Sequence, residues 1–238
     1  MSESLLKLRG VEAGYGDVQI LWGIDLDVRA GEIACIVGSN GAGKTTLLRT
    51  ISGVIKASVG SIRFDGHSIE NTEPDVILGR GIAHVPEGRR LFKGLSVNDN
   101  LLLGAHLRYD RPGIAHDLER VYEIFPQLAE RRSQDATTLS GGEQQMCAVG
   151  RGIMSRPLLL LVDELSLGLA PRALESLCDA LLELNRTGTT ILLVEQDVLT
   201  AFEMARHGFV LELGRIVISG KTASLAEDTN IQKAYLGV

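Results

Sequence analysis

The sequence predicts an α/β fold in which a mixed sheet carries an N-terminal antiparallel β region and is interrupted by a helical insertion. Residues 24–28 and 62–65 alternate apolar with charged side chains, the period of a half-buried strand. Residues 33–37, 158–162 and 191–194 are instead apolar without alternation, which is typical of parallel strands covered by helices on both faces. Residues 94–151 show mostly helical patterning and no clear buried strand.

The elements along the chain agree with this class. Between the last two apolar strands, residues 171–184 carry Leu174, Leu177, Cys178 and Leu181 at three- and four-residue steps, which predicts a helix facing the sheet and therefore a βαβ unit. A hairpin is expected at 209–213 and 215–219 around Gly214, followed by a short helix near 230–235.

The 238 residues are expected to form a single domain. Its α/β core should comprise residues 1–87 and 156–238, and the inserted helical subdomain residues 88–155. Within the insertion, one helical face is formed by Leu118, Val121, Tyr122 and Phe125.

Composition excludes several classes of protein. The formal net charge is -6, which gives no support to nucleic-acid binding, since that needs a basic face. The three cysteines, Cys35, Cys147 and Cys178, show no metal-ligand spacing and are expected to be buried, reduced thiols of a cytosolic protein. We expect neither a signal peptide nor a membrane-spanning segment, because no basic start with a long apolar run and no stretch of roughly 20 apolar residues occurs.

A phosphate-binding loop follows the apolar strand 33–37. It fits GxxxxGK[ST] and consists of Gly38, Ser39, Asn40, Gly41, Ala42, Gly43, Lys44 and Thr45, with Thr46 opening the next helix. Glycines let several backbone N–H groups point into one concavity, and the helix adds its positive N-terminal end. Lys44 would contact the β- and γ-phosphates, and the Thr45 hydroxyl would ligate Mg²⁺. The sequence therefore predicts a P-loop NTPase core.

Two acids end the apolar strand 158–162. Asp163 and Glu164 should point in different directions, because side chains alternate along a strand. Asp163 suits a second contact to Mg²⁺, and Glu164 suits a general base beyond the γ-phosphate. Both lie at the carboxyl edge of the sheet, where open α/β sheets bind ligands.

A second anion site is expected at residues 139–145, whose sequence is LSGGEQQ. Ser140 can cap a helix that begins near Glu143, while Gly141 and Gly142 leave backbone N–H groups accessible. One ATP needs only one phosphate loop, so this second site is best explained as completing the site of a partner. In this order and spacing, the motifs resemble those of ABC ATPases. That resemblance implies two ATPase subunits joined head-to-tail, with each ATP held between one phosphate loop and the other subunit's signature.

The resemblance implies roles for three more residues. Tyr15 matches the aromatic residue that stacks on adenine, with an exposed turn tyrosine as the alternative. Glu87 stands where most of the family has a glutamine that senses Mg²⁺ and γ-phosphate, and it either binds the metal or lies too far away. Gln196 stands at the usual switch histidine, where it can position the γ-phosphate but cannot gain a proton. Leu165 and Ala170 replace the usual proline and aspartate of the intervening loop.

PEGRR at 86–90, SLGLAP at 166–171, VEQ at 194–196 and the ending AYLGV together resemble the shorter, LivF-like ATPase subunit of branched-chain amino-acid importers. The implied cofactors are ATP and Mg²⁺, with Glu164, Gln196 and Lys44 as catalytic residues. The implied partners are a second, homologous and non-identical ATPase subunit, integral membrane permeases, and indirectly a periplasmic or surface solute-binding protein. The implied location is the cytoplasmic face of the membrane.

Alternatives remain open. The importer could carry urea or another small amide or amino acid, or the chain could be a soluble ABC ATPase or a nucleotide-binding regulator without turnover. A single cassette without a long coiled-coil insertion disfavours the second, and intact Lys44, Asp163 and Glu164 disfavour the third. Residues 89–92 form either a plain basic turn or a docking surface for the membrane partner. The five histidines form no cluster and are expected to be structural or solvated.

Overall fold

The computed structural model describes residues 4–233. A four-stranded antiparallel sheet has the order β2-β1-β4-β5. Its strands are β1 (Ser4–Tyr15), β2 (Val18–Arg29), β4 (Ala57–Phe64) and β5 (His67–Ser68). A six-stranded sheet has the order β10-β9-β3-β8-β7-β6. Its strands are β3 (Ile33–Val37), β6 (Ile82–Val85), β7 (Leu159–Asp163), β8 (Thr190–Glu195), β9 (His207–Glu212) and β10 (Arg215–Lys221). All its neighbouring strands are parallel except the antiparallel pair β9 and β10, so the predicted α/β class with a mixed sheet is confirmed.

The six-stranded sheet separates two apolar cores. In β3, Ala34 and Ile36 join the core that faces the antiparallel sheet and α1 (Lys44–Ile51), whereas Ile33, Cys35 and Val37 join the core beneath the other helices. Strands β7 and β8 alternate in the same way, and every residue of all three strands is buried. Because both faces are covered, these strands show no polar alternation in the sequence.

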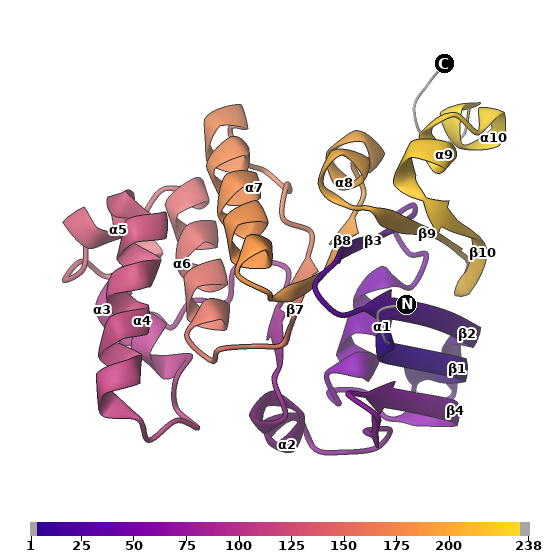
Figure 1. Ribbon diagram of the computed structural model, residues 1–238, viewed down its shortest axis with the longest axis horizontal. Coiled ribbons are helices and arrows are strands. Elements are labelled where there is room, and N and C mark those ends of the chain that lie inside the picture. Colours follow the sequence, from indigo (N-terminus) through magenta and orange to yellow (C-terminus); the bar gives the residue numbers. More distant parts are fainter. Residues whose placement is uncertain (1–3, 234–238) are drawn as a thin grey trace.

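Helices cover the other face of this sheet, and most of them lie to its left in Figure 1. They are α3 (Val97–Leu103), α4 (Arg111–Ile124), α5 (Pro126–Glu130), the 3₁₀ turn η1 (Ala136–Thr138), α6 (Gly141–Ile153), α7 (Pro171–Arg186) and α8 (Val198–Met204). On the predicted face of α4 and the residue that follows it, Val121, Tyr122 and Phe125 are buried and Leu118 is partly buried. The predicted bounds of the inserted subdomain stay a prediction.

The smaller elements differ in detail from the prediction. Strand β6 was not anticipated, because its four residues carry too short a pattern to detect. Helices α2 (Pro74–Gly79), α9 (Thr222–Ala226) and α10 (Thr229–Ile231) are short. The helix expected at 230–235 corresponds to α10, which begins one residue earlier. The last part of the expected range lies outside the described residues, as does the ending AYLGV.

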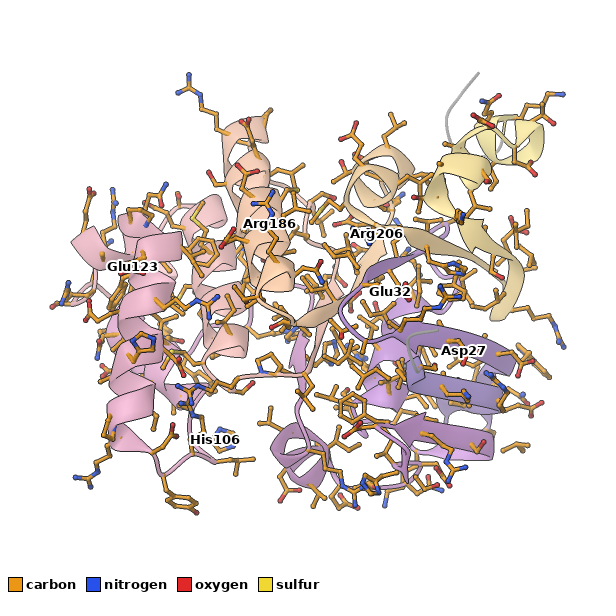
Figure 2. All side chains as sticks on the ribbon, viewed as in Figure 1. Asp27, Glu32, His106, Glu123, Arg186 and Arg206 are labelled. Carbon is orange, nitrogen blue, oxygen red and sulfur yellow. The ribbon has the colours of Figure 1, made fainter. Side chains whose placement is uncertain are left out.

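Charged side chains project from the surface around the molecule, as Figure 2 shows for Glu123 on α4 and Arg186 on α7. The three cysteines are free thiols, and burial raises the pKa of Cys35 and Cys147 to about 12. Among residues 4–233, no helix is long and apolar enough to cross a bilayer.

Candidate active site

The phosphate loop joins the end of β3 to the start of α1, as the sequence predicts. Gly41 and Gly43 have φ values of 79° and 106°, a backbone region that glycine enters without strain. A Cβ at Gly38 would lie 2.2 Å from the carbonyl oxygen of Leu211, so only glycine fits there. The first N–H groups of α1 have no acceptor within the helix, which makes this concavity suitable for an anion.

Lys44 is the buried cation of this loop, with only 4% of its surface exposed. Its Nζ donates to the carbonyl oxygens of Gly38 at 2.8 Å and Ser39 at 3.2 Å, and lies 3.6 Å from a carboxylate oxygen of Glu164. The ammonium group therefore joins the loop to the acid pair at the end of β7.

Asp163 and Thr45 form a pair of oxygen ligands. The Thr45 hydroxyl donates to Asp163 Oδ1 at 3.3 Å, and Asp163 Oδ2 is buried with no hydrogen-bond partner. Burial, assisted by the charges of Glu164 and Glu87, raises the pKa of Asp163 to about 6. An orphaned carboxylate oxygen beside a hydroxyl fits a hard divalent cation such as Mg²⁺. Among residues 4–233, no group of three or more His, Cys, Asp and Glu side chains is placed to hold a metal ion.

Glu164 faces the same cavity as the phosphate loop. Its backbone is in the left-handed region at φ 50°, its N–H donates to the carbonyl oxygen of Val194 at 2.9 Å, and its side chain is 12% exposed. Glu87 and Gln196 also line this cavity of about 430 Å³, together with Thr46, Asn40 and most of the loop. The structure thus brings together the predicted base, the switch residue and the phosphate loop, while their roles stay predictions.

Tyr15 ends β1 next to α1. Its hydroxyl accepts hydrogen bonds from Arg49 at 3.0 Å and from Thr46 at 3.5 Å, and 46% of the residue is exposed. Tyr15 does not itself line the cavity, so its predicted contact with adenine stays a prediction.

The predicted second anion site begins α6. Ser140 caps this helix, accepting from the N–H of Glu143 at 3.4 Å, while the Glu143 carboxylate accepts from the Ser140 N–H at 2.9 Å and from its hydroxyl at 2.6 Å. The hydrogen bond from Ser140 is the main reason that the pKa of Glu143 lies below its usual value. The helix begins at Gly141, two residues before the predicted start.

Ser140, Gly141 and Gly142 line a cavity of about 550 Å³ that shares no residue with the cavity of the phosphate loop. A Cβ at Gly142 would lie 2.5 Å from that of Ala173, so glycine permits the close approach of α6 and α7. The phosphate loop and the start of α6 therefore line two separate cavities, while the binding of an anion in each stays a prediction.

The basic turn after Glu87 is divided between two environments. Arg89 turns inward and donates to Gln144 Oε1 at 3.2 Å, next to Gly141. Arg90 and Phe92 instead line a separate cavity of about 710 Å³, and Arg151 of α6 donates to the carbonyl oxygen of Arg90 at 2.8 Å. The sequence could not predict which side chains of residues 89–92 turn inward, because four adjacent residues are too few to show a periodic pattern.

Sequence reasoning missed Glu195 as a site residue. It follows an apolar strand directly, was noted only as part of a motif, and is 1% exposed. Its carboxylate accepts from the N–H and the hydroxyl of Ser166 at 2.9 and 2.7 Å. A charged residue inside a run that is otherwise buried was the available signal.

Known proteins resemble this chain along its whole length. Residues 21–166 match the ABC transporter family. The chain is 43% identical to the high-affinity branched-chain amino acid transport ATP-binding protein BraG of Pseudomonas aeruginosa, covering 98% of this chain and 100% of BraG. It is 32% identical to the probable branched-chain amino acid transport ATP-binding protein LivF of Archaeoglobus fulgidus, covering 98% and 99%.

Two solved structures support the same relationship. A nucleotide-free ATP-binding cassette from an ABC transporter superposes with a TM-score of 0.85 at 25% identity, covering 99% of this chain and 100% of that one. The ADP conformation of another cassette superposes with a TM-score of 0.82 at 25% identity, covering both chains completely.

Proposed function

Because this chain belongs to the ABC transporter family, we propose that it is the ATP-hydrolysing subunit of an importer of branched-chain amino acids. The observation that supports the mechanism is that the phosphate loop and the start of α6, both suited to an anion, line two separate cavities of one chain. The 43% sequence identity to BraG over 98% of this chain supports branched-chain amino acids as the transported solutes.

In this proposal the phosphate loop and Lys44 hold the triphosphate of ATP. Phosphoryl transfer depends on positioning and on compensation of charge, which the loop N–H groups and the buried ammonium group supply. Thr45 and Asp163 would hold Mg²⁺, and this ion, when bound, neutralises charge on the phosphates. The unpartnered Oδ2 of Asp163 supports this assignment.

Glu164 is the proposed general base, and Gln196 positions the γ-phosphate by donating an amide hydrogen bond. Glu164 lies on the cavity wall beside Lys44, where it can polarise a water molecule that attacks the γ-phosphate. Glu87 lies on the same wall, and its negative charge contributes to the raised pKa of Asp163. This supports a position of Glu87 close to the proposed Mg²⁺ site. Tyr15 would stack on adenine.

Ser140, Gly141 and Gly142 would contact the ATP bound to a second cassette. Both the hydroxyl of Ser140 and the N–H groups at the start of α6 suit an anion. The sequence resemblance favours a different, longer cassette as the partner. Residues 88–155 are the proposed helical subdomain, and they carry this half-site.

The cavity that contains Arg90 and Phe92 is the proposed contact with the membrane permease, from the cytoplasmic side. Arg49 and Arg151 add positive charge to its mainly apolar wall. A solute-binding protein would act on the far side of the permease. Reversing the charge at Arg90 should reduce transport more than basal ATP hydrolysis, and unchanged transport would instead support a plain basic turn.

Uptake of labelled leucine by cells that carry the complete importer tests the function. The Lys44→Ala and Glu164→Gln variants should abolish uptake while the chains accumulate normally. Excess isoleucine or valine should compete with leucine, whereas excess urea should not. Competition by urea or by a small amide, without competition by valine, would favour the alternative solute.

A further inference from the structure

Glu195 is a buried carboxylate held only by neutral donors. It ends β8, is 1% exposed, and forms no ion pair with a basic side chain in the part of the chain that the structure describes. Burying a charge without a cation is strongly unfavourable unless hydrogen bonds compensate it. The donors around Glu195 therefore decide what this carboxylate does.

Those donors come from the loop after Glu164 and from the switch segment. The N–H and the hydroxyl of Ser166 donate at 2.9 and 2.7 Å, and the nearby N–H groups of Leu165 and Gln196 favour the ionised carboxylate.

These contacts hold the backbone of Glu164 from both sides. The Glu164 N–H donates to the carbonyl oxygen of Val194, and Ser166, two residues further on, binds Glu195. Glu164 itself has φ 50°, a conformation that costs a residue with a side chain some free energy and persists only when the surroundings impose it. The end of β8 supplies that constraint, and Gln196 follows directly.

We propose that Glu195 is a positioning residue for ATP hydrolysis: its carboxylate fixes the loop after Glu164 and the switch residue Gln196 as one unit. The same loop carries Gly168 and Ala170 to the cavity of Ser140, so Glu195 also sets where the loop meets the second half-site. The inference rests on the proposed role of Glu164 as the base.

Glu195→Ala leaves the N–H and the hydroxyl of Ser166 without their acceptor and frees the loop. Displacing a catalytic group by about 1 Å can cost 10²-fold in rate, so we expect kcat to fall about 10- to 100-fold. The KM for ATP should change less than about 2-fold, because the phosphate loop is untouched. Glu195→Gln keeps an oxygen acceptor and can donate to the Ser166 hydroxyl, so it should restore kcat to within about 3-fold of the parent.

Thr190→Val is the matched control. Thr190 begins the same strand, is fully buried, and its hydroxyl accepts from the N–H of Gly31 at 2.9 Å, but it lies at the opposite end from the site. This variant should lower the melting temperature without lowering kcat. If Glu195→Ala lowers stability and leaves kcat at the parental value, as Thr190→Val does, the positioning role is wrong.

Ser166→Ala keeps the proposal testable if Glu195→Ala fails to fold. It removes only the hydroxyl donor and should lower kcat about 2- to 5-fold at unchanged KM. A Ser166→Ala kcat equal to that of Thr190→Val would then overturn the inference. Glu164→Gln distinguishes failure of the proposed base from failure of the positioning role. If Glu164→Gln hydrolyses ATP at the parental rate, the proposed base is wrong. If Glu164→Gln loses activity while Glu195→Ala keeps the parental kcat, only the positioning role is wrong.

Discussion

Ser140 has two expected roles, as the cap of α6 and as a contact to the ATP of a second cassette. The two roles can be tested separately. The Ser140 hydroxyl accepts from the Glu143 N–H as the cap of α6, and its hydrogen, which donates to the Glu143 carboxylate here, should donate instead to the ATP of a second cassette. Ser96 caps α3 in a similar way, accepting from the N–H of Asp99 at 3.1 Å and donating to its carboxylate at 2.6 Å, but it belongs to no proposed site. Replacing either serine by alanine removes the same kind of cap.

The expected losses differ in kind. Removal of a serine cap costs about 1 kcal/mol of stability, so both variants should melt about 2–4 °C below the parent. A hydrogen bond to a charged group contributes about 1.5–3 kcal/mol, so Ser140→Ala should also lose about 10- to 150-fold in ATP turnover. Ser96→Ala should keep parental turnover, because α3 only needs its cap.

Thermal unfolding and steady-state ATP hydrolysis, measured well below the melting transition, check both expectations. Ser140→Thr keeps a hydroxyl and a good cap and should restore both properties in part. If Ser140→Ala and Ser96→Ala lose equal stability and both turn over ATP like the parent, Ser140 is only a cap, and the reasoning about the second half-site is wrong.

Three further outcomes are expected. Glu164→Gln should lower turnover about 10²- to 10⁴-fold with ATP affinity retained, as measured by rate assays and calorimetric titration; a parental rate would reject the base. Burial lowers the pKa of His84 to about 4, so below about pH 6.5 the imidazole of the unfolded chain binds a proton that the folded chain does not bind. The free energy of unfolding should therefore fall by roughly 3 kcal/mol as the pH drops towards 4. In denaturant titrations, the stability of His84→Gln should depend less steeply on pH than that of the parent. Gly142→Ala should destabilise the chain by about 1–3 kcal/mol through its clash with Ala173, and Ala173→Gly should relieve that loss in thermal unfolding.

The sequence predicted the parts of the fold that carry strong patterns. The buried runs of β3, β7 and β8 and the amphipathic α7 appear within two residues of their expected limits. The four-residue strand β6 escaped detection, because a run this short becomes a strand only through pairing with β7. Its place at the edge of the sheet beside β7, just before the loop of Glu87, depends on tertiary contacts that no local period records.

The candidate site was predictable where a motif fixes the backbone. The phosphate loop, the acid pair and the capped start of α6 each depend on local chemistry, and each lies where its motif indicated. The contacts of Glu195 with Ser166 join residues 29 positions apart and could not be anticipated. Arg89 shows the same limit, since only packing decides that it turns towards Gln144.

Assembly on addition of Mg-ATP tests the central claim most directly. The mass of the Glu164→Gln chain should be measured by light scattering, alone and beside the second cassette of its importer. We expect ATP to drive the chain into a pair of cassettes, and we expect the added Ser140→Ala substitution to weaken this pairing while ATP still binds. Saturating ATP binding to a chain that remains monomeric in both mixtures would contradict the account.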